Sequence, residues 1–322
     1  MRIENVEAAP GSIARGYVEI GHYPDMPIHS PLMIARGRKG GPTLWLQCLV
    51  HGPEVVGPIS AARFLREIDL EELSGTVVAL LVANPLGFRA YNRLTPQDGA
   101  NLNRVFPGKP DGSVSEQIAH RVLGLAMEHA DVLVDLHSGG DLTITAFYVI
   151  YPKLDSDGAR EAQRLASQVG SRYQWGSNEG WLKGAAFSNF TRRTGKPALI
   201  VESGGGARVT DEDLRNFRTA LFGVTRAMGM LPGVPPTVED VRGGGNALHL
   251  KASRGGFWQP LIAPGDDVVA GQELGHVVDV FGDVVETVTC SFAQAWIGSI
   301  RRPWMGVYAG DQVIEIVERL DP

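Results

Sequence analysis

The sequence predicts an α/β protein with a mixed sheet that carries helices on both faces, followed by a small all-β domain. Three observations support this prediction. Apolar runs of strand length alternate with segments of helical periodicity, as in α/β sheets. Several of these runs are nearly continuous, which is typical of strands buried on both faces. From about residue 236 the chain is rich in glycine and short β-type runs, without a convincing helix. We therefore expect domains at residues 1–235 and 236–322.

The first elements are expected to be strands, because β-branched or apolar residues run between Gly and Pro positions. They occupy residues 14–21, 28–37, 42–50 and 75–85. A helix is expected over residues 58–73. Pro58 fits the first turn of a helix and fits poorly in its interior, so residues 51–57 are predicted to be a turn.

Residues 84–112 are expected to form a long polar loop, and loops of that length in a compact domain usually carry function. Ser113 and Glu116 have capping-box spacing, which predicts the start of a helix. Strands and helices then continue to alternate. The expected strands are "DVLVDLH", "TAFYVIYP" and "PALIVE", and the expected helices are "GAREAQRLASQVG" and "TDEDLRNFRTALFGVTRAMGM".

Composition excludes several classes of partner. The formal net charge is -6, so no basic excess exists to neutralise the phosphates of a nucleic acid or an anionic membrane. The N-terminal residues lack the apolar core of a signal peptide, and no run reaches transmembrane length. The two cysteines, Cys48 and Cys290, lie in separate apolar stretches and indicate buried thiols in a reducing compartment. We therefore expect a cytoplasmic enzyme.

Chemically capable side chains follow three of the apolar strands. The first strand is followed by His51 and Glu54, the second ends in His137, and the third ends in Glu202. Ligands of α/β proteins bind at the carboxyl ends of strands. Two histidines and one carboxylate form the three-ligand zinc set of many hydrolases, and a further carboxylate can take a proton from the attacking water.

Each of these motifs also has a structural interpretation. "HGPE" alone is more often a turn. His137 can simply hydrogen-bond backbone, and Glu202 before "SGGGA" can be a carboxylate at a helix entry. The glycine run resembles a phosphate cradle, but no Lys-Ser or Lys-Thr follows it as a P-loop requires. The coincidence of three such sites at three strand ends favours the metal interpretation.

The long loop adds "NRLTPQDGANLNRVFPG", which offers Arg93, Asn103 and Arg104. A guanidinium beside an attacked carbonyl stabilises the developing oxyanion. A second one, together with an amide, can hold a substrate carboxylate. The alternative is a solvated loop with incidental arginines, which remains the interpretation for Arg89.

The motifs "HGPE", "NPLGF", "NLNRVFPG", "DLHSGG" and "VESGGG", in that order, resemble the succinylglutamate desuccinylase/aspartoacylase family. These enzymes are relatives of the zinc carboxypeptidases. The resemblance covers roughly residues 40–235, and the trailing β domain matches the family layout. Within the family, the loop and "DLHSGG" look most similar to deacetylases of the ectoine-degradation type, which act on N-acetyl-2,4-diaminobutyrate.

The resemblance implies one zinc ion per chain, held by His51, Glu54 and His137. It implies that Glu202 is the general base and acid of a hydrolase that removes an acyl group, most simply acetyl, from a small N-acyl amino acid.

The resemblance also assigns roles to the loop residues. Asn103 and Arg104 grip the carboxylate of the substrate, and Arg93 polarises the scissile carbonyl.

The sequence differs from the family at one position, and one residue of the family has no secure counterpart in it. Relatives often have Asp where this chain has Asn101, and an amide orients a zinc-binding histidine without the charge that raises its basicity. The tyrosine that assists the leaving group has no secure counterpart, and Tyr173 is the candidate. An acidic acyl group would need an extra cation, for which the candidates are Lys183, Arg192 and Arg208.

The β domain resembles a barrel-sandwich module of the biotinyl/lipoyl type. Lys251 is the only lysine beyond residue 240 and lies upstream of the hairpin-like pattern, so we interpret the domain as a structural cover and not a carrier. Two other functions stay open, namely a metallocarboxypeptidase acting on short peptides and a metal-free binding protein. Assembly into a homo-oligomer is also left open.

Overall fold

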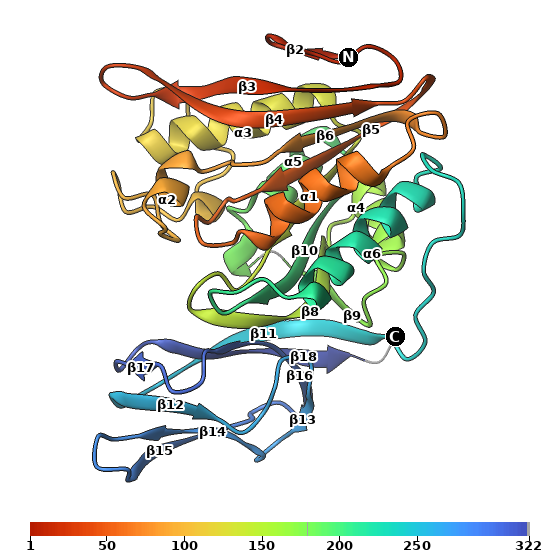
Figure 1. Cartoon of the computed structure of the whole chain (residues 1–322). Coiled ribbons are helices and arrows are strands. Elements are labelled where there is room, and N and C mark those ends of the chain that lie inside the picture. Colours follow the sequence, from red (N-terminus) through yellow and green to blue (C-terminus); the bar gives the residue numbers. More distant parts are fainter. Residues whose placement is uncertain (179, 321–322) are drawn as a thin grey trace.

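The apolar runs assemble into one large mixed sheet. In the computed structural model, which describes residues 1–178 and 180–320, this sheet has twelve strands (Figure 1). Two short strands at the start of the chain, β1 (Arg2–Ile3) and β2 (Val6–Glu7), pair with each other outside it. The strands of the sheet that precede residue 236 are β3 (Ser12–His22), β4 (Pro27–Arg36), β5 (Lys39–Cys48), β6 (Ser74–Leu80), β7 (Val132–His137), β8 (Thr143–Pro152), β9 (Tyr173–Ser177) and β10 (Ala198–Gly205).

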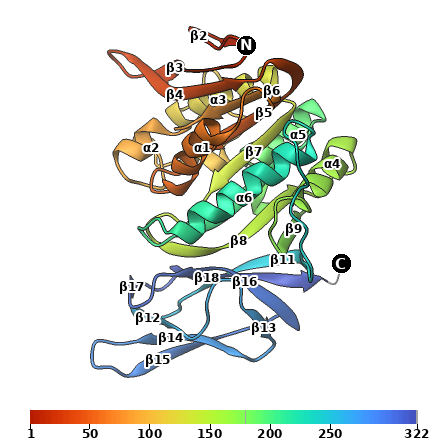
Figure 2. The ribbon, with the colours of Figure 1, turned by 45° about the vertical axis from the view of Figure 1, so that its right-hand side comes forward.

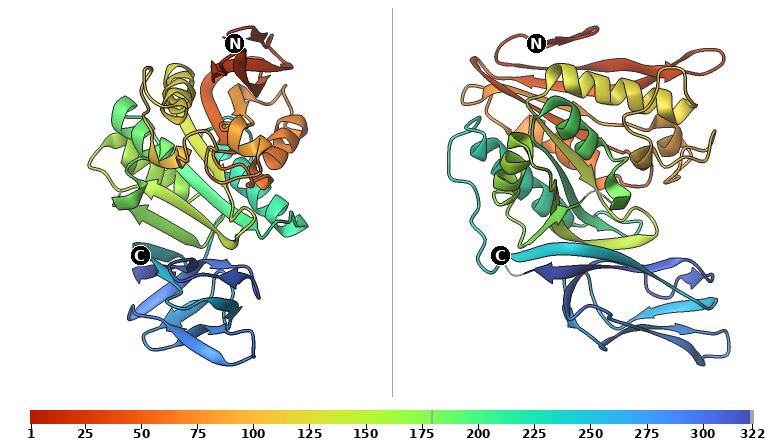
Figure 3. Two further views of the ribbon diagram at one scale, coloured as in Figure 1. Left: turned by 90° about the vertical axis from the view of Figure 1, so that its left-hand side faces the viewer. Right: turned by 180° about the vertical axis from the view of Figure 1, so that it is seen from behind.

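Helices cover both faces of this sheet, as the sequence predicts (Figures 1 and 3). One face packs against α1 (Val56–Glu67), α4 (Asp157–Ala166) and α6 (Asp211–Ala227). The other face packs against α3 (Val114–His129) and α5 (Ala186–Thr194). The capping box at the start of α3 is confirmed, since Ser113 and Glu116 bond reciprocally. Each face thus has its own buried apolar cluster.

Three neighbouring strands bring the predicted site residues to one edge. β7 pairs in parallel with β5 on one side and with β10 on the other. Their carboxyl ends therefore point the same way, and Glu202 lies directly opposite His137 in the register. The residues predicted to form the site therefore lie near one another at this edge of the sheet.

Some expected elements differ from the structure. Residues 84–112 do not form an uninterrupted loop, because they contain the short helix α2 (Pro85–Arg89) and the 3₁₀ turn η1 (Leu102–Arg104). The helix expected over 58–73 begins two residues earlier and ends at Glu67. Strand β9 and helix α5, with the 3₁₀ turn η2 (Gly180–Leu182) between them, had no predicted counterpart.

The described elements beyond residue 236 are strands. Four of them continue the large sheet, namely β11 (Arg242–Lys251), β13 (Asp267–Val269), β16 (Gln294–Arg301) and β18 (Gln312–Leu320). The others form a four-stranded antiparallel sheet in the order β15-β14-β12-β17 (Figure 2), with β12 at Gly256–Pro260, β14 at Glu273–Val278, β15 at Val284–Thr289 and β17 at Gly306–Val307. The two sheets enclose a third apolar cluster. The division of the chain at residue 235 stays a prediction.

Two junctions connect these strands to the rest of the sheet. β11 pairs with β9, and β16 pairs with β8. At this junction the fully buried Trp296 packs on Tyr148 and Tyr173, with ring centroids 5.4 and 4.9 Å apart. Lys251 is the last residue of β11, and Cys48 and Cys290 are free, buried thiols. No helix among the described residues has the length and apolar character needed to cross a membrane.

Candidate active site

The turn after β5 carries His51 and Glu54 under tight steric constraint. Leu49 has a φ of 52°, so the chain bends sharply as the strand ends. A Cβ at Gly52 would lie 2.2 Å from the carbonyl oxygen of Gly87 in α2. Asn84 fixes α2 in turn, because its side chain accepts from the Gly87 N–H and donates to Val50 O. The HGPE turn is therefore held against the first short helix of the following loop.

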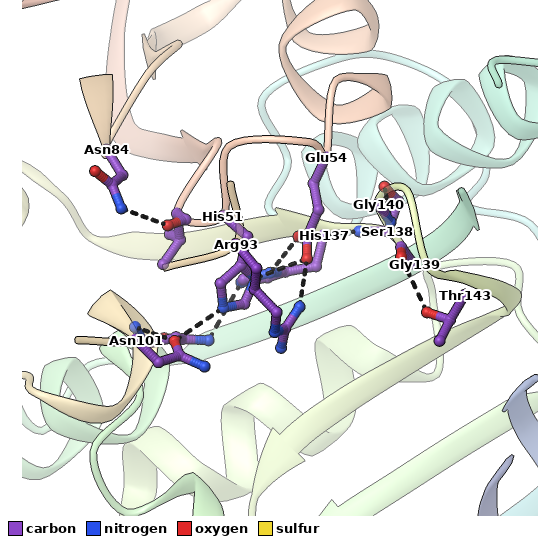
Figure 4. Close-up of polar contacts among 12 residues, drawn as sticks. His51, Glu54, Asn84, Arg93, Asn101, His137, Ser138, Gly139, Gly140 and Thr143 are labelled. Atoms are coloured by element: carbon purple, nitrogen blue, oxygen red, sulfur yellow. Dashed lines mark hydrogen bonds and ion pairs between the residues drawn. The ribbon is translucent and has the colours of Figure 1, made fainter. Parts of the chain in front are cut away.

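The side chains of His51, Glu54 and His137 converge in a buried cluster (Figure 4). One carboxylate oxygen of Glu54 lies 2.7 Å from His51 Nδ1, and the other lies 2.8 Å from His137 Nδ1. The Ser138 N–H also donates to Glu54, at 3.3 Å. Both Nδ1 atoms thus face the same carboxylate, and the three ligand atoms lie within 4.8 Å of one another.

Second partners fix the far side of each imidazole ring. His51 Nε2 lies 3.0 Å from the amide oxygen of Asn101. His137 Nε2 lies 3.1 Å from a carboxylate oxygen of Asp135, which is fully buried two residues earlier on β7. Such contacts orient metal-binding histidines and set which nitrogen faces the metal. Asp135 was not singled out from the sequence, although its spacing of two places it on the same face of the strand as His137.

Opposing effects set the pKa values within the cluster. Burial and the nearby Arg93 guanidinium lower the pKa of His51 to about 4. Burial alone would raise the pKa of Glu54, but the two histidines outweigh it and hold that pKa below its usual range. Burial would lower the pKa of His137, but Asp135 and Glu54 outweigh it and raise that pKa. The cluster therefore keeps its carboxylate ionised.

The loop residues predicted to touch substrate all line the pocket that contains the cluster. Arg93 Nη1 lies 3.0 Å from Glu54 Oε1. Asn103 is buried, and its side-chain oxygen accepts from the Ala186 N–H at the start of α5. Arg104 donates to the carbonyl of Asn103, and burial together with Arg93 lowers its pKa to about 10. The structure thus brings both guanidiniums to the same cavity.

Glu202 lies on the same pocket wall as the cluster. It is half-buried and lies opposite His137 within β10, because the strand continues to Gly205 and does not end at Glu202 as expected. Burial raises its pKa to about 8, His137 opposes that rise, and the carboxylates of Glu54 and Glu315 add to it. A carboxyl group with a pKa near neutrality can both accept and return a proton at physiological pH.

The pocket also contains residues that the sequence did not predict. Tyr148 on β8 lines it, and so do His249, Arg301, Gln312 and Glu315 from the strands beyond residue 236. Nothing in the sequence indicated their role, because these residues lie within segments whose pattern is that of an ordinary β-strand. The pairing of β16 with β8 and of β11 with β9 places them at the cavity.

The expectation for Tyr173 is wrong. Its hydroxyl donates to the carbonyl of Gly265, and its ring packs on Trp296, so it is a packing residue outside the pocket. Of the three candidate cations for an acidic acyl group, Arg208 lines a different cavity. Lys183 and Arg192 are not among the described residues that line the pocket, which instead contains Arg301. Arg301 pairs with Asp311 at 3.2 Å.

The donor set of the cluster fits a zinc ion. Two imidazole nitrogens and one carboxylate are buried together, and each imidazole is oriented by a second partner. Catalytic zinc sites use three protein ligands of this kind and leave a position open to solvent or substrate. The cluster lines a pocket, so that fourth position would be accessible.

Comparison with known proteins gives a consistent result. A family model described as the succinylglutamate desuccinylase/aspartoacylase catalytic domain matches residues 40–228. The N-alpha-acetyl-L-2,4-diaminobutyric acid deacetylase of Halomonas elongata is 30% identical over 288 residues, covering 87% of this chain and 83% of that protein.

Solved structures extend the likeness over the whole fold. The product-bound ectoine utilization protein EutE (DoeB) of Ruegeria pomeroyi has a TM-score of 0.83 at 23% identity, covering 99% of this chain and 100% of that one. An aspartoacylase family protein of Mesorhizobium loti has a TM-score of 0.80 at 26% identity, covering 98% and 96%. The shared architecture therefore includes the strands beyond residue 236.

Proposed function

Because the chain belongs to the succinylglutamate desuccinylase/aspartoacylase family, we propose that it is a zinc-dependent amidohydrolase acting on a small N-acyl amino acid. The acyl group is acetyl in the simplest case, and the substrate resembles N-acetyl-diaminobutyrate, as in the Halomonas relative. One observation supports the proposal most strongly: the buried His51, Glu54 and His137 cluster shares one pocket with Glu202. The relationship to zinc carboxypeptidases belongs to the same proposal.

The proposed metal ligands are His51, Glu54 and His137, with one zinc ion per chain. When bound, zinc supplies Lewis-acid chemistry, since it lowers the pKa of a water molecule and polarises a carbonyl. Binding to these three side chains also requires deprotonated imidazoles, so His137 must release the proton that Asp135 and Glu54 otherwise stabilise.

Glu202 performs the proton transfers in this proposal. In its ionised form the carboxylate accepts a proton from the attacking water. The protonated carboxyl then returns that proton to the nitrogen of the leaving amine as the amide bond breaks. The pKa of about 8 and the position opposite His137 support both steps.

The guanidiniums bind and stabilise the substrate. Arg93 Nη1 lies 3.0 Å from Glu54 Oε1, which supports a role for its guanidinium in hydrogen-bonding the oxygen that gains charge when the carbonyl is attacked. Asn103 and Arg104, neighbours on η1, are proposed to hold the carboxylate of the amino acid. The substrate would thus be held by its carboxylate at one end and attacked at its amide. A cytoplasmic location is proposed with this activity, supported by the two free, buried thiols.

The test of the proposed function is Glu202→Gln in zinc-loaded protein, assayed with N-acetyl, N-succinyl and N-formyl amino acids. We expect the variant to lose at least about 10²-fold in kcat with one of these substrates, while the zinc content per chain is unchanged. The control is Glu212→Gln, an exposed carboxylate on α6. Activity of the Glu202 variant within tenfold of wild type would contradict the assignment of the base, and no hydrolysis of any substrate by wild type would contradict the function.

A further inference from the structure

The carboxylate of Glu315 occupies an unassigned position in the catalytic pocket. It comes from β18, beyond residue 236, and its side chain is only 8% exposed. One of its oxygens accepts a hydrogen bond from the Tyr148 hydroxyl at 2.7 Å, and the other lies 3.0 Å from His249 Nε2. Glu315, Tyr148 and His249 all line the pocket that contains Glu202 and the cluster.

The surrounding backbone leaves room for this carboxylate. Gly298 lies where β16 shifts its register against β18, and a Cβ there would come within 2.7 Å of Glu315 Oε1. A side chain at position 298 would therefore push the carboxylate away from Tyr148. Tyr148 and His249 thus hold the carboxylate of Glu315, and Gly298 leaves the space that it occupies.

The two partners of the Glu315 carboxylate leave part of its hydrogen-bonding capacity unused. A carboxylate can accept about four hydrogen bonds, and Tyr148 and His249 each present one hydrogen to it. Because the Tyr148 hydroxyl donates its proton to Glu315, its oxygen can only accept from a ligand. Two acceptor groups, one of them charged, are suited to an ammonium group, which carries three donors and a positive charge. They would repel a substrate carboxylate.

The corner lies near both ends of the proposed substrate. The charge of Glu315 raises the pKa of Glu202 and opposes the lowering of the pKa of Arg104. Glu202, proposed to serve the scissile amide, and Arg104, proposed to hold the carboxylate, line the same pocket as Glu315. A group in this corner would belong to the side chain of the amino acid, a few bonds from the reacting centre.

We propose that Glu315 and Tyr148 form a subsite for a positively charged amino group on the substrate side chain, so that the enzyme selects N-acyl diamino acids. This inference rests on the proposed function, and it assigns specificity to strands that the sequence suggested were only a cover. Acidic and apolar side chains of similar length would be disfavoured there.

The test compares a ligand pair and a variant pair. Free 2,4-diaminobutyrate and norvaline have the same shape, but norvaline has a methyl group where the diamino acid has its terminal ammonium. We expect wild-type protein to bind the diamino acid about 10- to 100-fold more tightly by calorimetry, as for hydrogen bonds to a charged group. Glu315→Gln should reduce that ratio to within about threefold of unity, and kcat/KM for the two N-acetyl derivatives should change in the same way.

Two further variants serve as a control and as a substitute for Glu315→Gln. Glu318→Gln removes a carboxylate from the same strand that binds Asn246 outside the pocket, and it should leave the ratio unchanged. If Glu315→Gln does not fold, Tyr148→Phe keeps the charge and should lower the ratio by about 2- to 10-fold. Equal binding of the two ligands by wild type, or an unchanged ratio in folded Glu315→Gln, would overturn the subsite.

Failure of the subsite and failure of the proposed function give different results. A protein that hydrolyses N-acyl amino acids without preference for the diamino side chain retains the function and loses the subsite. A protein that binds diamino acids through Glu315 but hydrolyses no N-acyl derivative retains the subsite and loses the function.

Discussion

The two imidazoles of the cluster are oriented by chemically different partners. His137 faces the buried carboxylate of Asp135, whereas His51 faces the neutral amide of Asn101. A carboxylate raises the basicity of a ligating imidazole more than an amide does. The amide of Asn101 also accepts from the backbone N–H of Asn103, so it holds η1 as well as the ring. The two histidines should therefore contribute unequally to metal affinity.

This difference between the two histidines predicts a substitution that strengthens zinc binding. Asn101→Asp keeps both acceptor contacts and adds the charge, so we expect zinc affinity to rise by about 10-fold in a competition titration with a chromophoric chelator. The matched reverse change, Asp135→Asn, should lower the affinity by about 10- to 100-fold. Equal affinities for all three proteins would show that the outer partners do not tune the site.

Glu202 predicts a pH dependence of stability in protein stripped of metal. Its pKa is about 8 in the folded chain and 4.5 in an unfolded reference, so folded protein retains a proton that the unfolded chain has released. Its contribution to stability is full below about pH 4.5 and is lost as the pH rises towards 8.

The measurement compares wild type with Glu202→Gln by urea unfolding after chelator treatment. Relative to the variant, the free energy of unfolding of wild type should fall between pH 5 and pH 8, by on the order of 1 kcal/mol or more. A difference that stays constant over this pH range would contradict the raised pKa.

At the scale of elements, the segment between β6 and α3 is held by one carboxylate. Asp98 accepts from the hydroxyls of Ser113 and Ser115 at 2.8 and 2.9 Å, and from the backbone N–H of Ser115. It thereby ties the stretch that carries Arg93 and Asn103 to the first turn of α3. These contacts lower the pKa of Asp98 despite its partial burial, so the carboxylate is ionised when it makes them.

Removal of this tie should weaken substrate binding and leave the metal in place. We expect Asp98→Ala to raise KM by about 10-fold, because loosely held guanidiniums lose productive orientation. With zinc in excess, the zinc content should match wild type, since His51, Glu54 and His137 lie outside this segment. Asp111→Ala, an exposed carboxylate of the same segment, is the control. An unchanged KM would show that Asp98 does not position the loop.

The elements also show which parts of the fold the sequence could predict. The runs ending at His51, His137 and Glu202 were recognisable because buried parallel strands are almost wholly apolar, and polar residues mark their ends. The capping box of α3 was recognisable for a similar local reason. Strand β9 and helix α5 were missed because they are short, with five and nine residues, and their structure depends on the neighbours that bury them. For the same reason, the pocket positions of Tyr148 and Glu315 could not be predicted, because strand pairing between distant segments creates them.

At the scale of the whole molecule, the strands beyond residue 236 complete the sheet instead of lying beside it. β11 pairs with β9 and β16 pairs with β8, which joins the later strands to the sheet (Figure 2). Trp296 is fully buried against Tyr148 and Tyr173. A chain without them would expose an unpaired sheet edge and the apolar surface that these residues cover. Both features promote aggregation.

This pairing predicts the behaviour of a shortened chain. Residues 1–235 expressed alone should be mostly insoluble or show no cooperative thermal transition by circular dichroism, whereas the full chain melts cooperatively. Soluble, cooperatively folded protein from residues 1–235 would show that the sheet is stable without its later strands.

The position of β18 also affects when the enzyme becomes active. In chain order it follows every other described strand, yet in the sheet it lies between β16 and β11, and it carries Glu315 into the pocket. The ribosome synthesises the chain from its N-terminus, and domains generally fold as units. The zinc ligands are then already synthesised, but the wall that recognises the substrate is not. A nascent or prematurely terminated chain would therefore contain the residues that bind metal but lack a finished pocket, and hydrolysis would begin only after translation has passed β18.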